Sequence, residues 1–225
     1  MPLPYQLKPF PYSSHDWILT ILSRAGRPLR ILEVGTAAGY LGRILSESGH
    51  ALVGVELDQD AAGEARPYYE QMCVANLETF QFPWRAEFDW ILFADVLEHL
   101  PNPGKVLGRS IACLKPSGKI LISVPNIANF VIRLSLLAGR FDYTDRGILD
   151  RTHVRFFTLR TLTEMLDRCG LRVLEVRATP VPLQLAFPAT QARVFGLVHR
   201  ANYALARLRK QLFGYQFVVT AERKA

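Results

Sequence analysis

The sequence predicts an α/β fold, a doubly wound and mostly parallel sheet of seven strands with helices on both faces. Three observations predict this fold class. Short apolar runs alternate with amphipathic stretches over most of the chain. A glycine-containing turn at residues 35–39 joins the first apolar run to a helical pattern. The chain has 225 residues, 49% hydrophobic and 21% charged, which fits a single domain, 1–225, with a large core.

The individual elements follow from the same patterns. A first helix begins at Ser13 or Ser14, either of which can cap it, and belongs to an N-terminal helical cap, residues 1–27. The seven strands are expected at residues 30–34, 51–56, 72–75, 88–94, 119–124, 171–178 and 215–221. Helices are expected at 40–45, after Asp58, at 103–114 and at 159–169, the last stopped by Gly170.

Two segments interrupt the alternation of strands and helices. Residues 126–158 are predicted to form an irregular or partly helical insertion. Residues 180–214 are predicted to form a second insertion, in which a basic amphipathic helix covers about 190–213. Each insertion follows a predicted strand, so both are expected over the carboxyl edge of the sheet. Ligands of open α/β sheets bind at that edge.

The positive charge is concentrated near the end of the chain. The net charge is +7, and residues 176–221 contain no Asp or Glu but six basic residues. Nucleic acid is therefore not an expected partner, because the main domain is nearly neutral. The three cysteines are isolated and the N-terminal segment lacks the apolar core of a signal peptide. A cytoplasmic protein is expected.

The basic helix allows two interpretations. Apolar residues recur on it at helical spacing, opposite four arginines. The apolar set is Val194, Leu197, Val198, Ala201, Leu205, Leu208 and Leu212, and the basic set is Arg193, Arg200, Arg207 and Arg209. The stripe is either a packing face with a solvated cationic side, or a surface for peripheral contact with an anionic membrane or a partner protein.

The turn after the first strand carries the motif Glu33-x-Gly35-x-x-x-Gly39. Its spacing differs from G-x-G-x-x-G and it lacks the lysine of a P-loop, which argues against phosphate binding. An acid before the turn suits a ligand with a cationic amino group. Glu56 ends the next strand, where a carboxylate can accept both hydroxyls of a ribose. An amino acid joined to a nucleoside fits both acids; the alternative is ordinary turn glycines and a helix-capping acid.

Four stretches resemble class I S-adenosylmethionine-dependent methyltransferases: ILEVGTAAG, VGVELD, FDWILFADVLEHLPNP and LKPSGKILISVPN. The resemblance covers about residues 28–178 and implies a Rossmann-like methyltransferase fold with S-adenosylmethionine as cofactor. The residues implied to bind the cofactor are Glu33, Gly35, Thr36, Ala37, Gly39, Glu56, Leu57, Asn76, Leu77, Ala94 and Asp95. Asn76 departs from the acid that is frequent in the family at this position, although an amide can still meet the adenine amino group.

A narrower resemblance concerns the first insertion. The stretch RLSLLAGRFDYTDRGILDRTHVRFFT is similar to bacterial methyltransferases of polysaccharide and glycosylation pathways. It implies that residues 126–158 lie on the acceptor side of the cofactor. A glycan precursor or another small molecule is then the expected acceptor, and a glycosyltransferase is a candidate partner.

A second constellation follows the fourth strand. Asp95, Glu98 and His99 can share one face of a helical turn, and His153 follows from the insertion. Two carboxylates and two imidazoles form a ligand set for Mg²⁺, Mn²⁺ or Fe²⁺. The arrangement resembles the metal site of small-RNA 2′-O-methyltransferases and of some ubiquinone-pathway O-methyltransferases. Many metal-free relatives share the string DVLEHL, however, and in that case His153 or His99, with Asp95 beside it, is the candidate general base.

Three further residues of the insertion are candidate acceptor contacts. Arg151 and Arg155 can bind a carboxylate or phosphate, because a guanidinium presents a planar fork of donors. Their alternative is an ion pair with Asp142, Asp145 or Asp150. Tyr143 can contact a ring of the acceptor, while Phe156 and Phe157 fit the core better.

Together these features predict transfer of a methyl group from S-adenosylmethionine to an oxygen, with a sugar hydroxyl as the expected acceptor. Methylation of a nitrogen or a carboxylate is the first alternative. The second is a non-catalytic S-adenosylmethionine-binding module that scaffolds a glycosyltransferase. A nicotinamide-dependent dehydrogenase is disfavoured by the glycine spacing.

Overall fold

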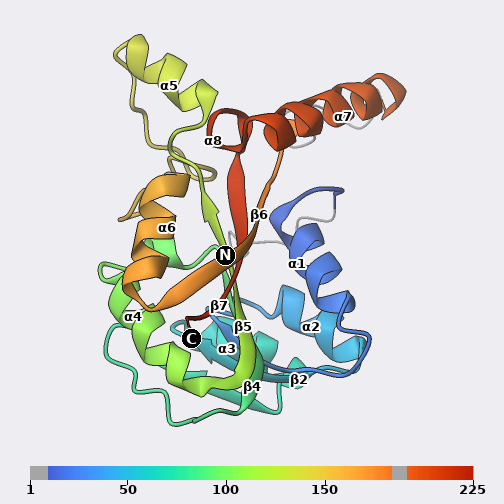
Figure 1. Ribbon diagram of the computed structural model, residues 1–225, viewed down its shortest axis with the longest axis vertical. Helices are drawn as coiled ribbons and strands as arrows, with labels where there is room; N and C mark the ends of the chain where they lie inside the picture. The colour runs from blue at the N-terminus through green and yellow to red at the C-terminus, as the bar shows by residue number, and fades with distance from the viewer. Residues whose placement is uncertain (1–9, 184–191, 225) are drawn as a thin grey trace.

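The computed structural model describes residues 10–183 and 192–224, and it confirms the predicted seven-stranded α/β sheet (Figure 1). The strand order is β3-β2-β1-β4-β5-β7-β6. The strands are β1 (Arg30–Val34), β2 (Ala51–Glu56), β3 (Gln71–Val74), β4 (Phe88–Ala94), β5 (Leu114–Pro125), β6 (Leu171–Ala178) and β7 (Gln216–Arg223). β7 is antiparallel to β5 and β6, and the other paired strands are parallel.

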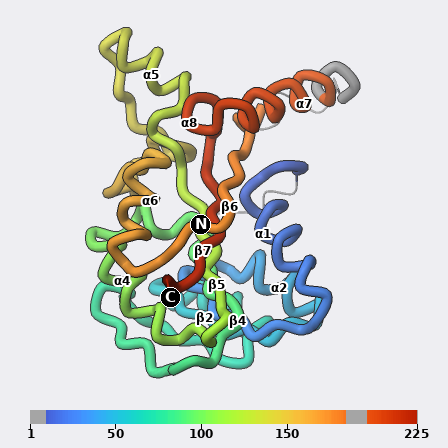
Figure 2. The backbone as a smooth tube through the Cα atoms, in the orientation of Figure 1, coloured from blue at the N-terminus to red at the C-terminus, as the bar shows by residue number. Residues whose placement is uncertain are grey.

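Helices cover both faces of the sheet, as Figures 1 and 2 show. One face carries α1 (Ser14–Ser23), α2 (Tyr40–Glu47) and α3 (Gln59–Ala65), and the other carries α4 (Pro103–Ser110) and α6 (Leu159–Arg168). The remaining helices are α5 (Phe130–Leu137), α7 (Ala192–Leu208) and α8 (Lys210–Phe213). They extend beyond the end of the sheet at which β5 and β6 finish (Figure 1).

Side chains at the helix starts explain where several helices begin. Ser13 caps α1, since its hydroxyl accepts a hydrogen bond from the Asp16 amide at 3.1 Å. Asp58 does the same for α3, accepting from the Ala61 amide at 2.8 Å. Each cap satisfies an amide that the first helical turn leaves without a backbone partner.

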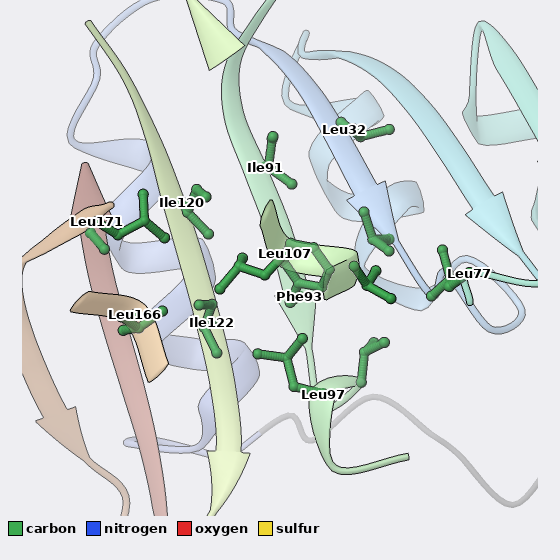
Figure 3. Packing of buried hydrophobic residues seen from close by; sticks show 14 of the residues in the cluster. Leu32, Leu77, Ile91, Phe93, Leu97, Leu107, Ile120, Ile122, Leu166 and Leu171 are labelled. Carbon is green, nitrogen blue, oxygen red and sulfur yellow. The ribbon is translucent and has the colours of Figure 1, made fainter. Parts of the chain in front are cut away.

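Alternating strand residues build two cores, one on each face. Ile91 and Phe93 of β4 point to the α4–α6 face, where they pack with Leu107 and Leu166 (Figure 3). Leu92, between them, packs on the opposite face against the cluster that includes Leu45 of α2. This period of two, with apolar residues on both sides, is typical of a sheet buried between helices.

The structure corrects two predicted boundaries. The helix expected at 103–114 ends at Ser110 and continues as a 3-10 turn, Ile111–Cys113, so β5 begins at Leu114 rather than 119. The register with β4 shifts between Phe88 and Trp90, which accommodates the Lys-Pro-Ser-Gly stretch as an irregular start of β5 rather than a separate turn.

The helix expected at 190–213 is two helices in the described part of the chain. α7 ends at Leu208, and Arg209, with φ −131° and ψ 71°, separates it from α8. Residues 190 and 191 of that prediction lie outside the described residues. No helix within 10–183 and 192–224 is long and apolar enough to cross a membrane.

Of the two interpretations of the basic helix, the packing face does not hold for the described side chains of α7. The helix contacts the body of the protein through other residues: Tyr203 stacks on Tyr12 at 3.8 Å between ring centroids, His199 lies 3.0 Å from the Pro11 carbonyl oxygen, and Ala206 is buried. Among the described members of the stripe, Leu197 is 73% and Leu208 is 77% exposed, while Leu212 is half-buried. The surface under α7 presents Tyr12 and the Pro11 carbonyl. The side of the helix with His199, Tyr203 and Ala206 therefore packs there, and the side with the leucines does not.

Candidate active site at the carboxyl edge

The turn between β1 and α2 follows a path that requires glycine. Gly35 and Gly39 have φ values of +77° and +74°. A Cβ on Gly35 would lie 2.5 Å from Cγ2 of Val96, and one on Gly39 would lie 2.9 Å from Cα of Ala65. At both positions the left-handed backbone disfavours any side chain, and the close neighbour leaves no space for a Cβ atom. Ala37, between them, also has a positive φ, +44°.

Glu33 lies beneath this turn. It is buried, and its carboxylate accepts a hydrogen bond from the Tyr69 hydroxyl at 2.7 Å. Burial raises the pKa of Glu33 to about 7, and the nearby Glu56 adds to the rise. Tyr69 was not predicted from the sequence as a site residue. Its hydroxyl fills the space beside Gly42, where a Cβ would approach to 2.2 Å.

Glu56 connects the end of β2 to the same turn. One carboxylate oxygen accepts from the Ala37 amide at 2.8 Å, and the other accepts from the amides of Leu57 and Asp58 at 2.8 and 3.0 Å. These bonds fix the orientation of the carboxylate. The oxygen that accepts from Ala37 alone retains a further lone pair, so the group can still accept from a ligand hydroxyl.

The other predicted cofactor residues divide into exposed and buried positions. Leu57 and Asn76 are exposed, and Ala37 and Ala94 are half-buried. Thr36 and Leu77 are buried; the Thr36 methyl group packs on Gly54 of β2. These two side chains therefore support the site from beneath. The amide oxygen of Asn76 accepts from the Glu78 amide at 2.9 Å, which holds the turn after β3.

Asp95 adopts a left-handed conformation, with φ +57°, immediately after β4. Its amide donates to the Ser123 hydroxyl oxygen at 3.0 Å, and its carboxylate accepts from the Ser123 hydroxyl and from the Gln216 side-chain amide. A left-handed aspartate costs about 1–3 kcal/mol of strain, and such positions concentrate at functional sites. Ser123 and Gln216 are site residues that the sequence did not reveal.

Glu98, His99 and His153 form a cluster whose candidate ligand atoms all lie within 4.8 Å of one another. The rings of the two histidines are 4.8 Å apart between centroids, at 70° to each other. The Glu98 carbonyl oxygen accepts from the amides of Val154 and Arg155 at 2.9 and 3.0 Å. These two bonds attach the insertion to the turn after β4 and bring His153 to a residue 54 positions earlier in the chain.

Asp95 is not part of this cluster, which corrects the expected set of four. Glu98 and His99 belong to a short 3-10 turn, Leu97–His99, and Asp95 precedes it in the left-handed conformation. The helical spacing that would place Asp95 on the same face therefore does not apply. Its carboxylate is directed to Ser123 and Gln216 instead.

Each histidine of the cluster is oriented by a backbone carbonyl. Nδ1 of His99 lies 3.2 Å from the Thr152 carbonyl oxygen, and Nδ1 of His153 lies 3.0 Å from that of Ile148. Since a carbonyl only accepts, the neutral rings carry their protons on Nδ1 and keep a lone pair on Nε2. Burial, together with the neighbouring His153, lowers the pKa of His99 and favours its neutral form.

The predicted acceptor contacts have partners within the protein. Arg151 forms an exposed ion pair with Asp145 at 3.1 Å, which was the alternative interpretation. The Arg155 guanidinium donates to the Pro101 carbonyl oxygen at 2.9 and 2.6 Å, so it fastens the insertion to the loop before α4. Tyr143 is exposed and packs edge to face on Phe141 at 5.6 Å.

The strand order and the turn between Glu33 and Glu56 define an α/β protein that binds its ligand at the carboxyl edge of the sheet. A family model described as a methyltransferase domain matches residues 7–176. The chain belongs to this family. It is an S-adenosylmethionine-dependent methyltransferase, and S-adenosylmethionine is its cofactor.

Curated relatives carry the name ubiquinone biosynthesis O-methyltransferase. The protein from Aromatoleum aromaticum is 27% identical over 197 residues, which cover 84% of this chain and 80% of that protein. The protein from Dechloromonas aromatica is 31% identical over 120 residues, and this chain spans about half of its length, 50%. These relatives give no support to the polysaccharide-pathway resemblance.

Solved structures confirm the fold. An S-adenosylmethionine-dependent methyltransferase from Mesorhizobium loti has a TM-score of 0.64 at 18% identity, covering 94% of this chain and 98% of that one. A magnesium protoporphyrin IX methyltransferase from Synechocystis, with bound S-adenosylhomocysteine, has a TM-score of 0.63 at 15% identity, covering 94% and 82%.

Proposed function

We propose that this methyltransferase transfers the methyl group to a hydroxyl oxygen of a small molecule. The observation that carries the proposal is the pair of oriented histidines, His99 and His153, in the turn and insertion that follow β4 and β5. An unactivated hydroxyl is a weak nucleophile, and a neutral imidazole near the reacting oxygen can take its proton. The names of the relatives, which are O-methyltransferases, support the same chemistry.

In the proposed reaction the acceptor oxygen attacks the methyl carbon in line with the bond to sulfur. The carbon–sulfur bond breaks, its electron pair returns to sulfur, and S-adenosylhomocysteine leaves; the hydroxyl proton passes to Nε2 of a histidine. The sulfonium is already activated, so the protein chiefly aligns the reactants. Glu56 is proposed to hold the ribose and the 35–39 turn to hold the methionine part, while Glu33 supports that turn from below.

We further propose a neutral aromatic alcohol, rather than a sugar phosphate or a carboxylate, as the acceptor. Arg151 and Arg155, the cations that would recognise an anionic group, are engaged by Asp145 and Pro101. Aromatic rings lie beside the histidine pair instead: Phe156 is 6.4 Å from His153 and 5.9 Å from Phe141, between centroids. Such rings stack with an aromatic acceptor.

An acceptor panel tests this proposal. The purified protein with labelled S-adenosylmethionine is offered a catechol, a free sugar, a sugar phosphate and an aromatic carboxylate. An O-methylated catechol, identified by mass spectrometry, is the expected product. Labelled product from the sugar phosphate or carboxylate alone would overturn the choice of acceptor, and product methylated on nitrogen would overturn the reaction class.

The cluster also supports an alternative to the histidine base, in which a divalent cation binds the Nε2 lone pairs and activates the hydroxyl in their place. Its residues are one carboxylate and two imidazoles, a donor set suited to Mn²⁺ or Fe²⁺ and, less strongly, Mg²⁺. The candidate ligand atoms all lie within 4.8 Å of one another, so the three side chains would have to close around an ion to bind it at about 2.0–2.3 Å. The carbonyls behind both Nδ1 atoms are the second layer that metal-binding histidines usually have.

We propose that Glu98, His99 and His153 would hold this ion, which when bound would lower the pKa of an acceptor hydroxyl. Titration of the chelator-treated protein with Mn²⁺, followed by electron paramagnetic resonance, tests the site without an activity assay. One bound Mn²⁺ per chain, lost in His153→Ala but retained in the control His15→Ala, whose half-buried histidine lies on α1, is expected. Equal Mn²⁺ binding by both variants would refute the metal site and leave the histidines as bases.

A further inference from the structure

Most of the large apolar side chains that are exposed in the described part of the chain belong to two segments, residues 131–143 and α7. Among the described side chains, ten of the fourteen large apolar residues that are exposed lie between 131 and 143 or on α7. They are Val131, Leu134, Leu136, Leu137, Phe141, Tyr143, Leu197, Val198, Leu205 and Leu208. α5 and α7 both project beyond the carboxyl edge of the sheet (Figure 1). We refer to these ten residues as the α5–α7 face.

On α7 the exposed apolar residues form one stripe with arginines along its border. Leu197, Leu205 and Leu208 lie on one side of the helix, opposite the buried Ala206. Arg200 and Arg207 are exposed and flank this stripe. No Asp or Glu occurs from Val176 to Ala221, so the border is positive along its whole length.

The two projections are joined at their bases. The side-chain amide of Asn126 donates to the carbonyl oxygens of Gln211 and Gly214 at 3.1 and 2.8 Å. Asn129, which also caps α5, donates to the Gly214 carbonyl oxygen at 2.9 Å. These buried asparagines satisfy carbonyls at the end of α8 that have no helical partner. α5 and the α7–α8 pair are therefore held relative to each other at the sheet edge.

We propose that the α5–α7 face docks on the surface of an anionic lipid bilayer. Burial of exposed leucine side chains at the headgroup–acyl boundary of a bilayer lowers the free energy, because it removes apolar surface from water. The flanking arginines can pair with lipid phosphates. A second copy of the chain is disfavoured as the occupant, because a two-fold dimer would place the arginines of one α7 against those of the other. The proposal does not depend on the identity of the methyl acceptor.

Vesicle flotation of the full chain, loaded with S-adenosylhomocysteine, tests the proposal. Vesicles of phosphatidylcholine are compared with vesicles that also contain phosphatidylglycerol. We expect flotation with the anionic vesicles and its loss at high salt, because screening weakens the attraction of the arginines. The double variant Leu197→Ser/Leu208→Ser should bind at least about ten-fold more weakly. Arg200→Gln and Arg207→Gln should each weaken binding about five-fold.

Matched variants outside the face serve as controls. Leu174 of β6 and Arg168 of α6 are exposed and lie elsewhere. Leu174→Ser and Arg168→Gln should therefore leave flotation unchanged, and every variant should retain its affinity for S-adenosylhomocysteine. The absence of flotation with both vesicle types would overturn the proposal. So would equal flotation with both, or a dimer in sedimentation that Leu197→Ser/Leu208→Ser converts to a monomer.

Discussion

The proposed cofactor side and the proposed acceptor side of this site are built in different ways. On the cofactor side, Glu33, the 35–39 turn and Glu56 lie within 24 residues of sequence and contact one another directly. On the acceptor side, His153 reaches Glu98 and His99 across 54 residues, and Asn126 and Asn129 bind carbonyls more than 80 residues away. The first region is fixed by local geometry, and the second depends on packing of inserted segments. Changes in the two regions should therefore have separable effects.

The largest expected effect is on the cofactor side. Gly35→Ala combines a positive φ with a Cβ 2.5 Å from Val96, so it should lower the free energy of unfolding by about 4 kcal/mol and abolish S-adenosylhomocysteine binding. Gly49 has φ +83° and nothing within 4 Å of its Cβ position. Gly49→Ala should then cost only about 1–2 kcal/mol and leave binding intact. Chemical denaturation measures the free energy of unfolding of each variant, and calorimetry measures its binding of S-adenosylhomocysteine. Equal losses in Gly35→Ala and Gly49→Ala would show that the contact with Val96 is unimportant.

Glu33 should make stability depend on pH. Its pKa is about 7 in the folded protein against an ordinary 4.5, so the folded state retains a proton that the unfolded state loses. This contribution is fully present below pH 4.5 and disappears as the pH rises through 7, at a cost of about 3 kcal/mol. Glu33→Gln, which stays neutral, should remove that decline. Denaturation from pH 5 to pH 8 checks this, and parallel curves for both proteins would contradict it.

Glu56 should control the affinity for the cofactor and have little effect on the KM for the acceptor. Glu56→Ala removes the charged acceptor that we propose for the ribose, so the Kd for S-adenosylhomocysteine should rise about 100-fold. Glu64→Ala, at an exposed position of the following helix, is the control and should leave the Kd unchanged. Calorimetry that gave the same Kd for wild type and Glu56→Ala would remove Glu56 from the cofactor site.

The smallest expected effect concerns the hydrogen bond from Asn129 at the start of α5 to Gly214 at the end of α8. Asn129→Ala removes the donor to the Gly214 carbonyl oxygen and should lower the free energy of unfolding by about 1–2 kcal/mol. Because α5 then loses one of its attachments to α8, the KM for the acceptor should rise while the Kd for S-adenosylhomocysteine stays constant. A change in that Kd as large as the change in KM would show that the two sides are not separable.

The sequence predicted the backbone around the 35–39 turn better than that of the inserted segments, because its signals are local. The bounds of β1 and β2, the Ser13 cap, the helix start after Asp58 and the glycine turn each depend on neighbouring residues. The spacing of Asp95, Glu98 and His99 misled, because it assumes a helical turn and Asp95 is left-handed. Ser123 and Gln216, which hold Asp95, lie 28 and 121 residues away and carry no recognisable pattern. The residue pattern of α7 predicted an amphipathic helix. It could not predict which side of the helix packs on the body, because that depends on the stacking of Tyr203 on the distant Tyr12.

The central claim is that His153 acts on the acceptor and not on the cofactor. The most direct test measures two quantities on His153→Ala: the Kd for S-adenosylhomocysteine and the rate of methyl transfer in a single turnover with saturating acceptor. Loss of a proton acceptor should slow transfer by at least about 100-fold. The Kd should remain within about two-fold of wild type, because no bond joins His153 to the 35–39 turn or to Glu56 among the described contacts. A transfer rate equal to wild type, or a loss explained wholly by weaker cofactor binding, would contradict the account.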